Sequence, residues 1–378
     1  MNRWRRACGV GLLAVAATGC GAPYLLRAAY EEARILLRRE PITDVLARES
    51  VDAPLRDKLR FVLAARQFAG DWLGFAVGES YATYARVDTD AVAYVVTAAY
   101  RDRLEAYTWR YPILGRLPYR GFFDRGRADV YAAQLEARDL DTAVWPTTAF
   151  STLGWFADPV LSSMLAEDTV ELVTTVFHEL THAFLYVPSA AAFNESFANF
   201  VGHRAAIVFF CDEALQRAVG AGAPASRCRL AEERWHDERV YAAVIEEVAD
   251  ALTTLYAAPT PAATRTEMRR HILAAATATL AQRPLQTERY RDRDLARYNN
   301  AVLLQQLLYR RALEQFEAVR HGADGDLRRA IIAIAAAVKE SPDPFADLGR
   351  LARGEPRVSA APDAVRRPGR RPRARRRR

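Results

Sequence analysis

The sequence predicts an α+β protein in which helix predominates. The stretch from Leu230 to the mid-340s is rich in alanine and leucine and favours helix almost throughout, with one break near Pro259–Pro261. Strand-forming residues concentrate in two segments, Asp90–Ala98 and Asp141–Phe150. Half of the 378 residues are hydrophobic and about a quarter are charged, which is the balance of an ordinary globular protein.

The predicted elements alternate between helix and strand before they become wholly helical. Helices are expected where apolar residues recur with a helical period, over Tyr24–Glu40, Pro54–Ala69, Asp124–Ala137, Glu171–Val187 and Asn194–Phe210. The stretch Tyr111–Phe123 contains two prolines and two glycines, so we expect it to be irregular. A small sheet should therefore precede the helix at Glu171–Val187, and a helical C-terminal region should follow it.

The first twenty residues have a basic start, a short apolar stretch and a small-residue ending. This apolar stretch is too short to remain as a permanent membrane span. The ending, Ala17–Cys20, resembles a bacterial lipoprotein signal, in which cleavage leaves Cys20 to carry lipid. We therefore expect a lipid-anchored protein of the cell envelope that faces the periplasm. The alternatives are a plain signal peptide and an uncleaved anchor.

The formal net charge of +7 arises at the two ends of the chain. Residues 366–378 contain nine arginines and no acidic residue, whereas the body between the signal and this tail is acidic. The charge therefore gives no reason to expect that the body binds nucleic acid. We expect a disordered, solvated tail; binding of the tail to anionic lipid or envelope polymer is the alternative.

Two cysteines, Cys211 and Cys228, remain once Cys8 is removed with the signal and Cys20 carries lipid. In an oxidising compartment such a pair is a candidate disulfide, which would close the Gly/Pro-rich loop between them. Two free buried thiols are the alternative.

The segment His178–His182 (HELTH) combines residue types that support metal-assisted hydrolysis. A helix has 3.6 residues per turn, so His178 and His182 lie on one face and can share a tetrahedral zinc ion. Glu179 can contact water on that ion without being a ligand, so it is the candidate catalytic base.

Glu195 is the candidate for a third ligand. A Met-turn zincin would need histidine at position 188 and glycine at position 185, but Pro188 and Leu185 stand there. Glu195 follows a short loop that permits reversal between helices, and it lies among phenylalanines, where an unpaired acid is unfavourable. The alternatives are a helix pair without metal and an inactive descendant of a metal site.

Two polar residues follow Glu195 on the same predicted helix. Asn199, one turn on, is a candidate to orient a liganding histidine, with an ordinary polar helix position as the alternative. His203, two turns on, is a candidate transition-state donor; the alternative is that it supports a ligand or is structural.

Several segments between residues 20 and 320 carry a resemblance to a known family. They are PITDVL, ARQFA, ESYATY, LPYRGFF, AFSTLGWFADPVLSSML, FHELTHAFLYV, FNESFANFVG and YNNAVL. In them the chain resembles a bacterial family of predicted aminopeptidases, many of them lipoproteins, within the glutamate-zincin (gluzincin) metallopeptidases. The resemblance implies a zincin-like fold and a zinc peptidase with ligands His178, His182 and Glu195 and catalytic base Glu179.

These segments also contain candidates for substrate binding. Thr147–Leu153 is a candidate to hold an extended peptide through its backbone. Donors to the oxyanion are sought among Tyr119, Arg120, Tyr81 and Tyr84. An aminopeptidase also needs an acid for the substrate's ammonium group, for which Glu79 and Asp158 are candidates.

We therefore expect a zinc-dependent peptidase that acts as an aminopeptidase on short peptides, with a lipid-mediated membrane contact as a further partner. The alternatives are a zinc endopeptidase acting on envelope proteins and a non-catalytic envelope lipoprotein on the same scaffold. The expected regions are the signal (1–19), an N-terminal α+β region (20–160), the zinc-site helices with the helical C-terminal region (161–350), and the Arg-rich tail (351–378).

Overall fold

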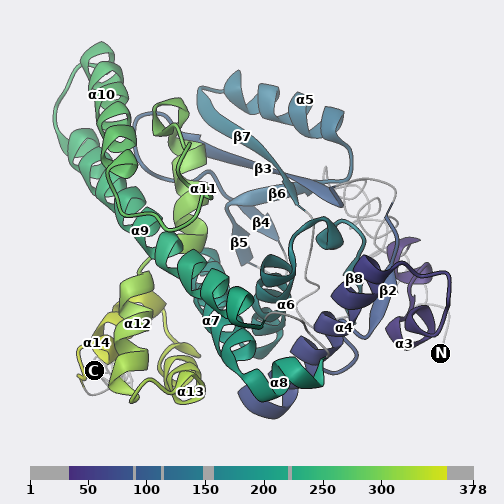
Figure 1. Cartoon of the computed structure of the whole chain (residues 1–378). Coiled ribbons are helices and arrows are strands. Elements are labelled where there is room, and N and C mark those ends of the chain that lie inside the picture. The colour runs from purple at the N-terminus through teal and green to yellow at the C-terminus, as the bar shows by residue number, and fades with distance from the viewer. Residues whose placement is uncertain (1–33, 88–90, 112–114, 148–156, 220–223, 356–378) are drawn as a thin grey trace, which may run out of the picture.

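The computed structural model describes residues 34–87, 91–111, 115–147, 157–219 and 224–355 (Figure 1). Within them the chain is predominantly helical with small sheets, so the predicted α+β class with helix predominating is confirmed. The signal peptide, Cys20 and most of the Arg-rich tail lie outside the described residues. Of the helix expected over Tyr24–Glu40, residues 34–40 are described; residues 34–37 are helical, but the helix ends before Arg38 and Glu40 lies in a strand, so the predicted end is wrong. No helix of the described ranges is both long enough and apolar enough to cross a bilayer.

The N-terminal part combines helices with a three-stranded sheet of order β1-β2-β8. Its strands are β1 (Glu40–Pro41), β2 (Thr83–Ala85) and β8 (Val160–Leu161), and its helices are α3 (Ile42–Leu46) and α4 (Ala53–Phe68), the latter extended by a π-helical turn (Ala69–Leu73). Helix α4 begins where predicted because Asp52 accepts a hydrogen bond from the Leu55 amide at 2.8 Å and Pro54 occupies the first turn.

A second sheet, of order β6-β3-β7, lies next to the central helices (Figure 1). It contains β3 (Ala93–Tyr100), β6 (Tyr119–Phe122) and β7 (Leu140–Thr147), and β3 runs antiparallel to both neighbours. Helix α5 (Arg125–Glu136) packs on one face and α11 (Asn300–Arg310) on the other (Figure 1). Among the described residues, β7 is an edge strand.

Most of the described part of Tyr111–Phe123 lies in strands, so the expectation that it is irregular is wrong there; residues 112–114 lie outside the described residues. Strands β4 (Trp109–Tyr111) and β5 (Gly115–Leu117) pair with each other, and β6 then joins β3. Pro118 lies between β5 and β6, where it removes no hydrogen bond from either strand. The prolines and glycines of this stretch predict a loop. The strand β6 forms because it pairs with β3, which lies some twenty residues earlier and is not visible in the local composition.

Helices α6 (Thr169–Phe184) and α7 (Ala191–Cys211) lie at the centre of the molecule, and α8 (Glu213–Ala218) and α9 (Pro224–Ala257) follow (Figure 1). Helix α6 begins at Asp168, which caps the amides of Val170 and Glu171. It ends three residues before the predicted Val187, because Leu185 is extended and Val187 precedes a proline.

The C-terminal region contains α10 (Ala262–Ala281), α11, α12 (Leu313–Gly322), α13 (Leu327–Val338) and α14 (Pro344–Ala352). The predicted break between α9 and α10 is confirmed. The sequence does not predict a second break, at residues 282–299, where the only helical turn is a short 3-10 segment (Leu295–Arg297). Buried Asp237 accepts the amides of Gln286 and Thr287 there, both at 2.7 Å, so tertiary bonds replace helical ones.

One large hydrophobic core joins the two ends of the described chain. It includes Ile42 near the start, Phe177 on α6, Phe200 on α7 and Leu348 on α14, all fully buried. Helices α6 and α7 are therefore held on several sides, which gives the residues on their facing surfaces defined positions.

Candidate metal centre and adjoining cavity

Helix α6 places His178 and His182 on one face, with their Nε2 atoms 3.2 Å apart. Only 14% of the His178 side chain and 7% of the His182 side chain are exposed. Glu179 lines the cavity into which His178 also faces. The helical spacing therefore brings these residues together as expected.

Asn194 determines how the chain reverses between α6 and α7. Its side-chain oxygen accepts from the Val187 amide and its side-chain nitrogen donates to the Val187 carbonyl, both at 2.9 Å and both buried. This clamp positions the next residue, Glu195. The sequence offers only the preference of asparagine for turns as a sign of this role.

Gly202 allows α7 to approach α6 closely beside His178. A Cβ atom at this position would lie 2.9 Å from the Thr174 carbonyl oxygen and 3.3 Å from the Cβ and amide nitrogen of His178. Backbone atoms cannot yield as a flexible side chain can, so only glycine permits this helix spacing. The distance between the histidines on α6 and the glutamate on α7 depends on it.

Glu195 completes a triangle with the two histidines. Its Oε2 atom lies 3.2 Å from His178 Nε2 and 3.5 Å from His182 Nε2. A tetrahedral zinc ion with bonds of about 2.0–2.1 Å requires donor atoms about 3.3–3.4 Å apart. Both the donor types and their spacing therefore fit zinc.

The charges of the three residues support one another. Burial tends to raise the pKa of Glu195, but His182 and hydrogen bonds to both rings hold it well below its usual range. Burial tends to lower the pKa of His182, but Glu195 raises it to about 8. Burial raises the pKa of Glu179 although both histidines oppose this, which makes Glu179 a better proton acceptor than an exposed carboxylate.

Two tyrosines approach the centre from the sheet side. Burial and the charge of Glu195 raise the pKa of Tyr119 on β6, and Glu195 is the largest cause of the raised pKa of Tyr309 on α11. The Tyr309 ring lies 6.0 Å from that of His178, centroid to centroid. Tyr119 was a sequence candidate, whereas no local pattern marks Tyr309. Its position follows from the packing of α11.

Tyr81 also lies near the centre, although on the N-terminal side. It is buried, and after burial the charges of Glu179 and Asp158 are the causes that raise its pKa. The Asp158 carbonyl accepts a hydrogen bond from the Tyr81 amide at 2.6 Å. Asp158 is itself buried, so it is not an open acid on the cavity wall.

Arg120 lies on the wrong face of its sheet to be an oxyanion donor. Successive residues of a strand point to opposite faces, so Arg120 points away from the side that Tyr119 faces. Its guanidinium donates to the Tyr131 hydroxyl at 3.4 Å and lies over the Tyr131 ring on α5. The expectation for Arg120 is therefore wrong.

Of the remaining substrate-binding candidates, only Thr147 lines the cavity among the described residues. Glu79 is exposed, and Tyr84 pairs with Val160 in the N-terminal sheet; neither lines the cavity. Of the segment Thr147–Leu153, Thr147 lines the cavity and the rest lies outside the described residues.

Asn199 and His203 contact a charged network instead of the metal ligands. The Asn199 amide donates to Glu238 at 2.8 Å and to the Tyr309 carbonyl at 2.9 Å, so it holds these residues and does not orient a liganding histidine. His203 packs on the Trp235 ring, 5.3 Å away, and burial lowers its pKa to about 4. The charges that act on it come from Glu238, Glu171, Arg289 and Arg310, so its position in this network favours the structural alternative over a transition-state donor.

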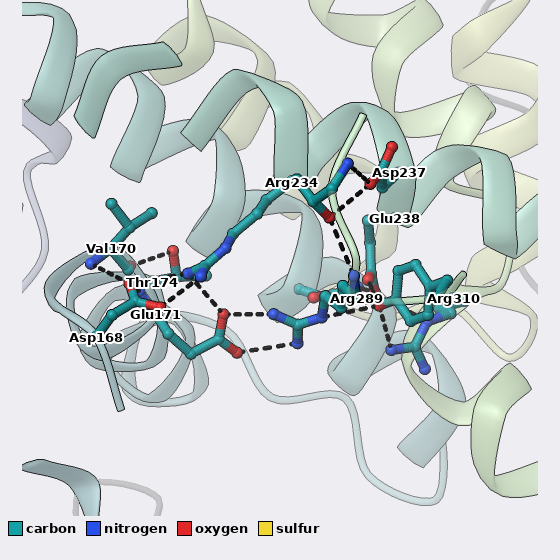
Figure 2. Close-up of polar contacts among 12 residues, drawn as sticks. Asp168, Val170, Glu171, Thr174, Arg234, Asp237, Glu238, Arg289 and Arg310 are labelled. Atoms are coloured by element: carbon teal, nitrogen blue, oxygen red, sulfur yellow. Dashed lines mark hydrogen bonds and ion pairs between the residues drawn. The ribbon is translucent and has the colours of Figure 1, made fainter. Parts of the chain in front are cut away.

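Figure 2 shows this network of acids and arginines, which the sequence does not predict. Arg289 binds Glu171 through two hydrogen bonds, of 2.5 and 3.0 Å, and Arg234 bridges Glu171 to the helix-capping Asp168. Farther along, Arg310 lies 2.9 Å from Glu238, which also accepts the Tyr290 hydroxyl. Its members are far apart in sequence, so no local spacing reveals them.

The cavity beside the metal centre has a volume of about 330 Å³ and a mostly polar wall. The wall includes His178 and Glu179 from the centre, Trp145 and Thr147 from edge strand β7, and the network members Glu171, Glu238, Arg289 and Arg310. The arrangement thus places a potential general base, hydrogen-bond donors and a sheet edge around one space.

Cys211 and Cys228 form a disulfide. It joins the end of α7, which carries Glu195, to the start of α9. The disulfide thereby links helix α7 covalently to helix α9, which carries Glu238.

A family model described as "Putative aminopeptidase" matches residues 23–343. The chain belongs to this family. The family supports peptidase activity of the aminopeptidase kind. No curated protein and no solved structure matches the chain.

Proposed function

We propose that this aminopeptidase-family protein is a zinc-dependent peptidase of the gluzincin type that hydrolyses short peptides. The observation that carries the proposal is the triangle of His178 Nε2, His182 Nε2 and Glu195 Oε2, with sides of 3.2–3.5 Å. Such a buried set of donors suits one divalent ion, and it adjoins a cavity lined by Glu179.

When bound, zinc supplies a Lewis acid that lowers the pKa of a water molecule and polarises the substrate carbonyl. Glu179 accepts a proton from the attacking water and returns it to the leaving amine, for which its raised pKa is suited. We assign Tyr309, which lines the cavity together with Glu179, and Tyr119, which is buried beside Glu195, as the hydroxyl donors to the oxyanion; a tyrosine is protonated at neutral pH even with its ordinary pKa.

The test is metal analysis of the purified protein followed by Glu179→Gln. We expect one zinc per chain, retention of that zinc in Glu179→Gln, and a loss of peptide hydrolysis of about 10²-fold or more. Glu213→Gln, which removes an exposed acid on α8, is the matched control and should keep full activity. Full activity of Glu179→Gln, or purified protein without stoichiometric metal, would contradict the proposal.

The aminopeptidase part has a separate test. One peptide is offered with a free N-terminal amine and with that amine acetylated, and an aminopeptidase should cleave only the first. Equal rates would favour the endopeptidase alternative.

We extend the proposal to location, with a lipid on Cys20 anchoring the protein in the envelope on the periplasmic side. Cys20→Ser should then move the protein from the membrane fraction to the soluble fraction. An unchanged distribution would contradict the lipid anchor.

A further inference from the structure

The acids on the cavity wall other than Glu179 are already bound to arginines. Glu171 is held by two hydrogen bonds from Arg289 and one from Arg234. Glu238 pairs with Arg310 and accepts from Asn199. Neither acid is therefore available to a substrate's ammonium group without breaking a buried ion pair, which is costly.

Not every arginine on the same wall has an ion-pair partner. Arg289 is paired with Glu171 and Arg310 with Glu238, but the wall also contains Arg293. Arg293 lies four residues after Arg289 in the irregular stretch 282–299; it is exposed and lines the cavity. Among the described residues, no acidic group or carbonyl pairs with its guanidinium. Of the arginines that line this cavity in the described part of the chain, Arg293 is therefore the one without an ion-pair partner.

We propose that this cavity binds the free C-terminal carboxylate of a short peptide, with Arg293 as the contacting residue. The inference rests on the proposed function and names its substrate class. A guanidinium presents paired N–H donors that match the two oxygens of a carboxylate. The neighbouring Gln305 and Gln306 side chains, on the same wall, offer further amide donors.

The size of the cavity limits what lies between the carboxylate and the scissile bond. A volume of about 330 Å³ is at the small end of the range for ligand sites. Because Arg293 and Glu179 line the same small space, the carboxylate must lie only a short stretch of chain from the reacting carbonyl. The site therefore favours short peptides over the interior of a long chain.

The experiment measures binding without turnover, on zinc-loaded full-length Glu179→Gln protein. Trialanine and trialanine amide are titrated calorimetrically at low salt, so the two probes differ only in the C-terminal carboxylate. We expect the free acid to bind about tenfold more tightly than the amide, which corresponds to about 1.4 kcal/mol. Adding Arg293→Gln should reduce this preference to about one.

The matched control is Arg291→Gln, which removes the same charge two residues away. Arg291 pairs with Glu288 at 2.8 Å and does not line the cavity, so the tenfold preference should persist. The inference is overturned if neither peptide binds, if acid and amide bind equally, or if the preference survives in Arg293→Gln. If the preference behaves as expected but the wild-type protein hydrolyses neither peptide, the carboxylate site stands and the proposed peptidase function fails.

Discussion

Replacing Gly202 by alanine tests whether the spacing of two helices sets the metal centre. The added Cβ would lie 2.9 Å from the Thr174 carbonyl oxygen and 3.3 Å from two atoms of His178. An ordinary contact needs 3.4 Å or more, so α6 and α7 must separate by a few tenths of an ångström. Overpacking of this kind costs about 1–3 kcal/mol of unfolding free energy.

The same displacement moves Glu195 away from the two histidines. Changes in the residues that support metal ligands typically weaken metal affinity about 10–100-fold, and we expect about tenfold here. Zinc affinity is measured by competition with a chelator, and stability is measured by denaturant unfolding of the metal-free protein, so the two effects are separated.

Gly322→Ala is the matched control, because no atom lies within 4 Å of a Cβ at this position on α12. Alanine there should leave zinc affinity unchanged and leave stability equal or slightly higher. The reasoning is refuted if Gly202→Ala binds zinc as tightly as the wild type, or if the two variants behave alike.

Three further predictions concern the supports of the site. Asn194→Ala removes two buried hydrogen bonds to Val187 and should lower the unfolding free energy by about 1–3 kcal/mol, measured by denaturant titration; an unchanged midpoint would contradict the clamp. Burial tends to raise the pKa of Glu238, but the charges of Arg310 and its neighbours lower it to about 2 in the folded protein. The ionised Glu238 therefore stabilises the fold above the pKa of about 4.5 that a glutamate has in the unfolded chain, and this stabilisation is lost as the pH falls toward 2. The difference in melting temperature between wild type and Glu238→Gln should therefore shrink over this range, and a constant difference would contradict it. Reduction of the Cys211–Cys228 disulfide, which spans 17 residues, should cost about 3 kcal/mol by loop entropy, and equal stability of oxidised and reduced protein would argue against this.

Much of the α6 contribution could be predicted from the sequence. The spacing of His178 and His182 predicts a shared face because a helix has a fixed period. The predicted bounds, Glu171–Val187, each differ from the observed Thr169–Phe184 by two or three residues. The disulfide partners follow from the expected signal and lipid anchor, which leave Cys211 and Cys228 as the remaining pair. These are properties of short segments, so they do not depend on what packs against them.

The contacts that complete the site depend on segments far apart in the chain. Tyr119 and Arg120 are adjacent in sequence, yet only Tyr119 faces the centre, and the difference is set by which face of β6 meets α11. Tyr309, Arg293 and the pair of Glu238 with Arg310 reach the cavity from the C-terminal region. The sequence pattern of the segments that contain these residues does not predict that they line the cavity.

The sequence by itself therefore determined the mainly helical class and the shared helix face of His178 and His182, and it offered Glu195 as the candidate third member of the site. Only the tertiary structure decided that Glu195 lies 3.2 Å from His178. It also decided which acids of the cavity wall are bound to arginines and, among the described residues of that wall, that Arg293 has no ion-pair partner. The physical reason is that helix geometry follows from bonds between residues four apart. Distances between helices, by contrast, follow from packing, which here depends on the missing side chain of Gly202 and the clamp of Asn194.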